Sequence, residues 1–220
     1  MILAGRVTVN GALVTLLGTR VDAERDVVAV DGVPVTRPAK HTLMLNKPPG
    51  YLTTVSDPQA RNTVMSLAPA IDGLHPIGRL DQETTGLLLL TNDGDLTFAL
   101  THPRHHVDKT YRAWVTGRPN EKHLAQLRRG IVLSDGLTAP AEVEIVARDA
   151  ERTLVEVTIF EGRKRQVRRM LQTIGHPVLS LTRLSIGPLT LGPLPEAQWR
   201  ELNEAEVQAL YHASGSLDPQ

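Results

Sequence analysis

A polar loop around Asp81 carries residue types that can do chemistry. Residues 78–94 run from Gly-Arg-Leu-Asp-Gln-Glu-Thr-Thr-Gly through four leucines to Thr-Asn-Asp-Gly. A lone loop aspartate is more often a cap or a surface group. Here, however, Arg79 lies two residues away and the loop enters an apolar run of strand length, and loops anchored on rigid elements are where catalytic groups tend to sit. The sequence therefore marks Asp81 as a candidate catalytic carboxylate.

A second stretch, residues 161–175, concentrates positive charge. Val167, Met170, Leu171 and Ile174 recur at helical spacing, and Gly175 stands where a glycine commonly ends a helix. The predicted helix places Lys164, Arg165, Arg168 and Gln172 along one flank of the apolar stripe and Arg169 on the far side. Arg168, at the border of the buried face, is predicted to reach into a partly buried site. Such a charge run is usually a solvated helix face, but its concentration on a chain of zero net charge favours an anionic partner.

The composition sets further bounds. Lys and Arg together number 24, as do Asp and Glu, so a nucleic acid would have to meet a local patch instead of a global positive field. The chain contains no cysteine, which excludes disulfides, thiolate metal ligands and a cysteine nucleophile. No apolar run approaches the roughly 18 residues of a membrane span, and the first residues are too short for a signal peptide. We expect a soluble, cytoplasmic protein.

Several common functional motifs are missing. The sequence has no phosphate-binding loop, no dinucleotide-binding glycine motif and no His-Glu-x-x-His. His102, His105 and His106 are close in sequence, but Pro103 breaks the helix that would align them, so a polar loop is expected instead of a metal site. Neither a metal nor a cofactor is predicted.

The chain changes character near residue 40. The first 36 residues contain short β-rich runs joined by Asn10-Gly11 and by Asp31-Gly32, which are typical of hairpin turns. A linker follows, and beyond it strands and helices alternate irregularly. We therefore predict a small β module over 1–37, a large domain over 40–212 and a flexible tail over 213–220.

The large domain is predicted to be α+β, with a mixed, largely antiparallel central sheet and flanking helices. Strands are expected over 41–46, 87–91, 111–117, 141–147 and 153–161. Beyond the basic helix, helices are expected over about 95–100 and from Asn203, where Glu206 three positions later makes a capping box.

Several segments taken together resemble one protein family. Residues 78–94 look like the signature of the RsuA/RluB group of ribosomal RNA pseudouridine synthases. Further segments resemble that group in the same order: 45–50, 102–104, 109–111, 161–170 and 184–189. The resemblance covers about residues 40–210. The first module also resembles the C-terminal half of an S4 RNA-binding module. Because Met1 falls just before its first hairpin, the pair of basic helices that normally opens such a module is expected to be absent.

The resemblance implies a reaction and roles for individual residues. The enzymes of this group isomerise uridine to pseudouridine without a cofactor, acting on a nucleotide flipped out of the RNA. Asp81 matches the catalytic carboxylate, which attacks the sugar or the base, or stabilises or deprotonates an intermediate. Arg168 is expected to pair with it, Tyr111 to stack on uracil or shuttle a proton, and Arg79 to hold the flipped nucleotide. The other expected RNA contacts are Lys47, Arg104, Lys109, Arg163, Lys164, Arg165 and Arg169.

The likeness also suggests a partner. Residues 102–106 and 135–140 look closer to members that modify large-subunit ribosomal RNA than to those that modify the small subunit, which stays the alternative. The protein is expected to act as a monomer. Two other hypotheses stand beside this one: a non-catalytic ribosome-assembly factor of the same fold, and an unrelated carboxylate enzyme such as a phosphotransferase or a glycosidase, for which Glu83 is the nearest second carboxylate.

Overall fold

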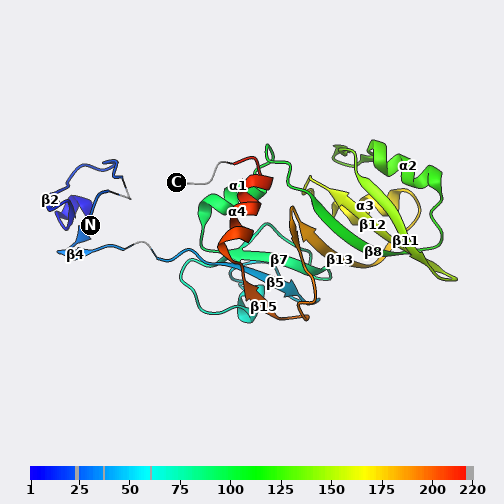
Figure 1. Ribbon diagram of the computed structural model, residues 1–220, viewed down its shortest axis with the longest axis horizontal. Coiled ribbons are helices and arrows are strands. Elements are labelled where there is room, and N and C mark those ends of the chain that lie inside the picture. Colours follow the sequence, from blue (N-terminus) through cyan, green and yellow to red (C-terminus); the bar gives the residue numbers. More distant parts are fainter. Residues whose placement is uncertain (23–24, 37, 60, 217–220) are drawn as a thin grey trace. The chain divides into compact units, whose positions relative to one another are not determined.

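The protein divides into two compact units, Met1–Ala39 and Lys40–Gln220. The structure is a computed structural model, and it describes residues 1–22, 25–36, 38–59 and 61–216 (Figure 1). The two units are described separately below. In the described part of the chain, no helix has both the length and the apolar character needed to cross a membrane.

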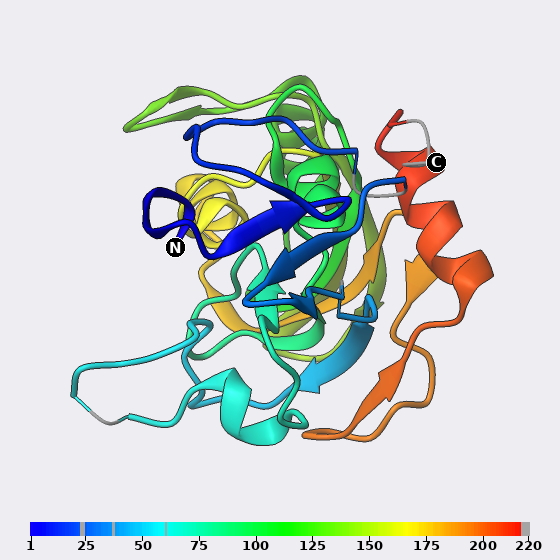
Figure 2. The ribbon, with the colours of Figure 1, turned by 90° about the vertical axis from the view of Figure 1, so that its left-hand side faces the viewer.

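The first unit is a small antiparallel sheet with the order β2-β1-β3-β4 (Figure 2). A short 3-10 helix, Ile2–Ala4, precedes its strands, which are β1 (Val7–Val9), β2 (Ala12–Leu13), β3 (Val28–Val30) and β4 (Val33–Pro34). The two predicted hairpins are confirmed, since Val9 pairs with Ala12 and Val30 with Val33. Asn10 and Asp31 have φ of 51°, and the glycine after each also has positive φ, which the tight turn requires.

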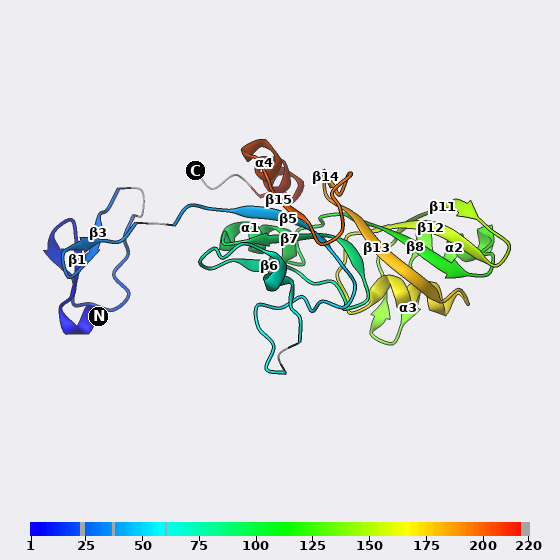
Figure 3. The ribbon, with the colours of Figure 1, turned by 90° about the horizontal axis from the view of Figure 1, so that it is seen from below.

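The second unit is built on a sheet in which nine strands are described (Figures 1 and 3). Its main path runs β11-β12-β8-β13-β7-β5-β15, with β6 paired to β7 and β14 to β13. The strands are β5 (Thr42–Lys47), β6 (His75–Ile77), β7 (Thr85–Thr91), β8 (Lys109–Thr116), β11 (Glu142–Arg148), β12 (Arg152–Ile159), β13 (Val178–Ile186), β14 (Leu189–Thr190) and β15 (Trp199–Glu201). Only the β13–β7 pair is parallel among the described pairs. The predicted mixed, largely antiparallel α+β fold is therefore confirmed.

Alternation along the central strands produces two hydrophobic layers. On β5, Leu43 and Leu45 pack in one cluster and Met44 in the other, because successive side chains point to opposite faces. On β7, Leu88 and Leu90 join the first cluster, while its other leucines join the second. Both faces of β7 are buried, which explains its unbroken leucine run.

Helices cover both faces. The helices α2 (Glu121–Arg129) and α3 (Gln166–Thr173) pack in the first cluster, whereas α1 (Gly94–Thr101) and α4 (Glu204–Ala213) pack in the second. Figure 3 shows α3 and α4 on opposite sides of the sheet. A 3-10 helix, Val64–Leu67, and a small hairpin of β9 (Val132–Leu133) and β10 (Gly136–Leu137) complete the unit.

The helix ends follow the side-chain caps in the sequence. Asp93 accepts a hydrogen bond from the backbone of Asp95 at the start of α1, and α1 ends two residues before Pro103. Asn203 and Glu206 form the predicted capping box of α4.

The basic helix α3 differs from its prediction at its start. It begins at Gln166, and Arg165 is its N-cap with φ of 52°. Lys164 and Arg165 therefore lie in the turn before the helix and not on its flank.

The segment 213–220 begins with packed residues. Ser214 is 6% exposed, and its hydroxyl donates to the carbonyl of Tyr211. The side chain of Ser216 lies 3.1 Å from Nδ1 of His105. Residues 217–220 of the tail that we expected to be flexible lie outside the described residues.

Gly86 brings β7 and β13 unusually close. Its φ is +99°, and a Cβ atom there would lie 2.3 Å from the carbonyl oxygen of Arg183. The parallel pairing of Thr85 with Thr182 and of Gly86 with Arg183 depends on this approach. Because the Asp81 loop leads directly into β7, this contact fixes the point at which the loop joins the sheet.

Candidate active site

The Asp81 loop lies between β6 and β7 and is pinned by its backbone. The amide of Thr84 donates to the carbonyl of Asp81 at 3.0 Å, which closes a turn. Leu80 is buried, and its carbonyl accepts a hydrogen bond from the hydroxyl of Thr53 at 2.9 Å. The amide of Gly50 donates to the carbonyl of Gln82. The loop is thus held on both sides of the carboxylate.

Lys47, one of the expected RNA contacts, anchors this loop through its buried amine. Its side chain has no exposed surface, and its amine donates to the carbonyls of Pro48, Gln82 and Thr84 at 3.0, 3.1 and 2.9 Å. Burial lowers the pKa of this amine to about 8, against the opposing effect of Glu83 and Asp81. The side chain cannot reach a ligand without leaving its three acceptors.

Two guanidinium groups approach the Asp81 carboxylate. Nη1 of Arg165 lies 3.6 Å from Oδ2, and Nε of Arg168 lies 4.0 Å from the same oxygen. The Arg168 side chain is only 12% exposed, compared with 43% for Arg165. Arg168 also donates to the hydroxyl of Thr84 at 3.3 Å. The predicted pairing of Asp81 with Arg168 therefore appears in the geometry, with Arg165 as a second cation.

Electrostatic effects at this pair follow from burial. Burial and the neighbouring Arg165 lower the pKa of Arg168, and Asp81 and Glu83 oppose them. Arg168 Nε is buried without a hydrogen-bond partner. Catalytic hydrogen bonds are often long before substrate binds and tighten afterwards. The free Nε can thus close on the carboxylate when a ligand excludes water.

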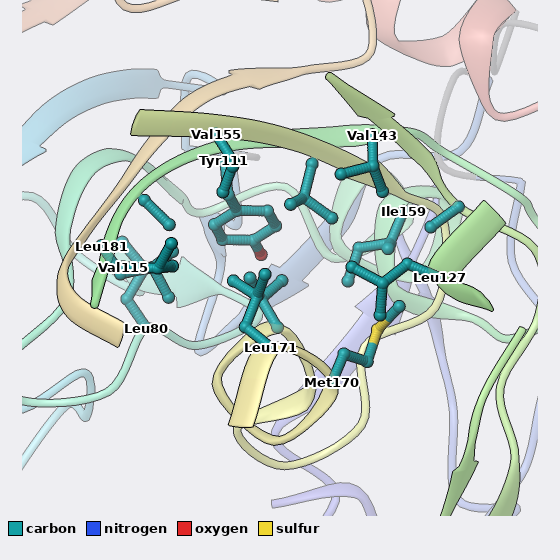
Figure 4. Packing of buried hydrophobic residues seen from close by; sticks show 14 of the residues in the cluster. Leu80, Tyr111, Val115, Leu127, Val143, Val155, Ile159, Met170, Leu171 and Leu181 are labelled. Carbon is teal, nitrogen blue, oxygen red and sulfur yellow. The ribbon is translucent and has the colours of Figure 1, made fainter. Parts of the chain in front are cut away.

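Tyr111 contributes to the same site from β8. Its side chain is 9% exposed and belongs to the first hydrophobic cluster. Figure 4 shows its ring among the labelled residues Leu80, Leu171 and Leu181. The phenol oxygen accepts a hydrogen bond from Nη1 of Arg183 at 3.5 Å. The ring is held by packing and its hydroxyl by a buried cation.

A cavity of about 480 Å³ joins these groups. Its walls include Arg79, Asp81, Thr84, Tyr111, Arg165 and Leu181. Arg168 does not line it and instead supports Asp81 from the side of α3. Glu83 does not line it either, and its carboxylate is 3.2 Å from Arg165. The cavity offers the Asp81 carboxylate beside cations, a phenol and an apolar wall, which suits a pyrimidine nucleoside. A second carboxylate in its lining, that of Glu161, is hydrogen-bonded to Arg163 and Gln166.

The other expected RNA contacts are placed unevenly. Arg79 and Lys164 are exposed and line the cavity. Arg163 lines it too, but its guanidinium binds Glu161 at 2.8 Å. Arg169 is turned away and binds Asp135 at 2.8 Å.

Two more of these residues lie beyond α1. Arg104 lies over the ring of Phe98, 5.2 Å from its centroid, and is not among the residues that line the Asp81 cavity. Lys109 donates to the carbonyls of Val107 and Phe160. His102 and His105 pack against Phe98, and no group of three possible metal-binding side chains occurs within the described ranges.

Sequence reasoning missed Arg183 and Thr84. Arg183 is 3% exposed on β13, and its Nε donates to the carbonyl of Leu87 at 2.7 Å. Arg183 lies two residues after the buried Leu181, and residues two apart on a strand share one face, so its side chain points inward. This spacing was the only signal in the sequence. Thr84 belongs to the segment 78–94 that resembles the family signature, but no role was predicted for it.

Comparison with known proteins adds independent findings. Residues 41–173 match the family model described as RNA pseudouridylate synthase. The chain is 45% identical over 217 residues to an RNA pseudouridine synthase of Aquifex aeolicus, covering 98% of this chain and 87% of that protein. It is 42% identical over 213 residues to the ribosomal large subunit pseudouridine synthase B of Bacillus subtilis, with 96% and 87% covered. A crystal structure of a pseudouridylate synthase matches with a TM-score of 0.73 and 33% identity, covering 95% of this chain and 90% of that one.

Proposed function

Since this chain belongs to the RNA pseudouridylate synthase family, we propose that it isomerises one uridine of large-subunit ribosomal RNA and that Asp81 is the catalytic carboxylate. The observation that carries the proposal is the meeting of Asp81, Arg165 and Tyr111 at one cavity, with Arg168 placed 4.0 Å from Asp81 behind its wall. The similarity to a large-subunit enzyme supports the choice of RNA.

The reaction consists of three changes in the substrate. The N1 to C1′ bond of uridine breaks, the uracil turns, and C1′ joins C5, whose proton moves to the released nitrogen. Asp81 is the negative group that meets the sugar or the base, and Arg168 and Arg165 stabilise its charge by their proximity. The reaction loses no group and changes no oxidation state, so these side chains suffice.

Tyr111 and the apolar wall position the base. The Tyr111 ring lies against the first hydrophobic cluster and faces the cavity that Asp81 lines, so an extruded uracil can stack on it. Arg79 is exposed at the cavity rim, where it can hold the flipped nucleotide or its phosphate. A monomer provides every one of these groups.

The first unit is proposed to help select the RNA. Its hairpins resemble half of an S4 module, and the similarity to the Aquifex aeolicus protein extends over nearly the whole chain, including this unit. Because aromatic residues are few, 3% of the chain, recognition should rest on RNA shape and phosphates more than on stacking.

Mapping of pseudouridines tests the proposal. Ribosomal RNA from cells with and without the gene is treated with carbodiimide, and reverse-transcription stops are compared. We expect one large-subunit stop to vanish without the gene, to return with the wild-type gene and to stay absent with Asp81→Asn. A lost stop in the small subunit would refute the choice of RNA, and a stop restored by Asp81→Asn would refute the role of the carboxylate.

A further inference from the structure

A second cavity adjoins the first across Tyr111. It has a volume of about 630 Å³ and shares Arg79, Tyr111 and the segment 161–163 with the Asp81 cavity. Its own walls come from α1, the segment after it, the start of β8 and the end of β13. Asp81, the proposed catalytic carboxylate, does not line this cavity.

Arg183 is a buried cation at this cavity without a carboxylate partner. Its side chain is 3% exposed, and no salt bridge to it occurs in the described part of the chain. Its Nε and Nη1 donate to Leu87 and Tyr111, but Nη2 is buried with no acceptor. The guanidinium also lies 6.0 Å from the centroid of the Tyr111 ring, so aromatic and carbonyl groups are its described partners. Buried charges in proteins are normally paired with an opposite charge, and this site therefore favours an anion.

Lys109 adds a second cation to the same cavity. Its amine donates to the carbonyls of Val107 and Phe160 at 2.7 and 3.3 Å, which leaves one of its three N–H groups for a ligand. Burial and the nearby Arg183 lower the pKa of this amine to about 8. The two cations therefore repel one another in the absence of an anion.

Two acidic residues lie near these cations. Asp108 opposes the lowering of the Lys109 pKa but does not line the cavity, and Glu161, which lines it, is engaged elsewhere. Glu161 accepts hydrogen bonds from Arg163 at 2.8 Å, from Gln166 at 2.6 Å and from the amide of Ala139 at 3.1 Å. Its carboxylate is thus already engaged on the side of α3.

The remaining walls suit a nucleobase. Phe160 and His106 form a stacked pair with ring centroids 4.5 Å apart and an interplanar angle of 29°. Ile77, Leu100 and Ile186 supply an apolar floor. Aromatic faces beside cations are the usual combination for holding single-stranded RNA.

We propose that this cavity binds a nucleotide next to the target uridine, with Lys109 and Arg183 taking its phosphate and the Phe160–His106 pair taking its base. Lys109 meets the phosphate through its free N–H, and Arg183 contributes its positive charge from the cavity wall. The proposal rests on the proposed action on RNA, but it concerns binding and needs no turnover.

The test measures binding of a fluorescent uridine pentamer that contains 4-thiouridine, by anisotropy across a range of salt concentrations. Lys109→Met and Arg183→Met are compared with Arg112→Met, an exposed arginine on the same strand as Lys109 that pairs with Glu156. We expect Lys109→Met to weaken binding about tenfold and to lower the salt slope by about 0.7, the value for one phosphate contact on a single strand. Arg112→Met should change neither quantity.

If Lys109 and Arg183 only stabilised the fold, their replacement would not change the dependence of RNA affinity on salt concentration. Arg183→Lys should restore most of the slope lost in Arg183→Met, and Lys109→Met serves if Arg183→Met does not fold. Photocrosslinking of the pentamer to wild-type protein should label Phe160 or His106. An unchanged slope in Lys109→Met, or crosslinks confined to the Asp81 cavity, would overturn the proposal. Turnover by Asp81→Asn would refute the catalytic assignment and leave this binding result as it stands.

Discussion

Two arginines touch one carboxylate, and their burial predicts very different contributions to catalysis. Arg168 lies 4.0 Å from Asp81 with 12% of its side chain exposed. At an effective dielectric constant of about 20, a charge pair at this distance is worth about 4 kcal/mol. Arg165 is closer, at 3.6 Å, but is 43% exposed, and exposed pairs contribute about 0–1 kcal/mol. We therefore expect Arg168→Met to lower the rate constant of the chemical step about 100-fold to 1000-fold and Arg165→Met at most about fivefold.

The assay is single-turnover tritium release from ribosomal RNA labelled at C5 of uridine. Single-turnover conditions separate the chemical step from RNA binding and product release. Arg169→Met is the matched control, because Arg169 lies on the same helix but pairs with Asp135. It should leave the chemical step unchanged while weakening the link from α3 to the β9–β10 hairpin.

The opposite ranking would refute this reasoning. If Arg165→Met slowed the chemical step as much as Arg168→Met, burial would not set the strength of the pair. If all three variants lost activity equally, the arginines would act together as a phosphate patch and not on Asp81. Thermal unfolding of each variant separates these outcomes from loss of the fold.

Two further predictions concern stability. Gly86→Ala should lower the free energy of unfolding by about 3 kcal/mol or more, because the residue has positive φ and its new Cβ would overlap the backbone of Arg183. The control Gly94→Ala has open space around it and should change the free energy of unfolding by less than about 1 kcal/mol. Similar urea midpoints for the two variants would contradict the close approach of β7 and β13. The buried amine of Lys47 has a pKa of about 8 when folded against 10.5 when exposed. The unfolded chain then binds more protons between these pH values, so the free energy of unfolding should rise with pH there, by up to about 3 kcal/mol relative to Lys47→Met. A difference between the two proteins that is flat from pH 7.5 to 10.5 would contradict the assignment.

Much of the fold could be predicted because local patterns carry it. Alternation of apolar residues placed β12, and the unbroken leucine run placed β7 in the interior. The hairpins at Asn10 and Asp31 and the capping box at Asn203 depend on residues that are adjacent in the sequence. Such features need no knowledge of distant contacts.

Long-range placement could not be predicted from the same patterns. The parallel pairing of β7 with β13 joins residues about 97 positions apart, and nothing local shows it. Lys47 is buried because its amine donates to carbonyls of the Asp81 loop, which is distant in the sequence. The motif around Lys47 shows nothing of these acceptors, and we therefore expected an RNA contact there. Helix α2 was also missed, although Asn120 as its cap and Leu124 and Leu127 on one face gave a usable signal.

In the candidate site, too, some residues could be predicted from the sequence and others depend on long-range contacts. Family likeness singled out Asp81, Tyr111 and Arg168, and the structure brings the first and third within 4.0 Å. Arg183 escaped notice because an isolated arginine in a strand says nothing about its neighbours. Its contact with Tyr111 exists only once β13 lies beside β8.

The most direct test of the central assignment is the chemical step of Asp81→Asn. The change keeps the shape of the side chain and removes its negative charge. Because position 81 is partly exposed, the loss of its charge should alter the affinity for RNA by no more than about threefold. We predict no tritium release above the protein-free background under single-turnover conditions. Release at a rate near that of the wild-type protein would show that the reaction does not depend on Asp81.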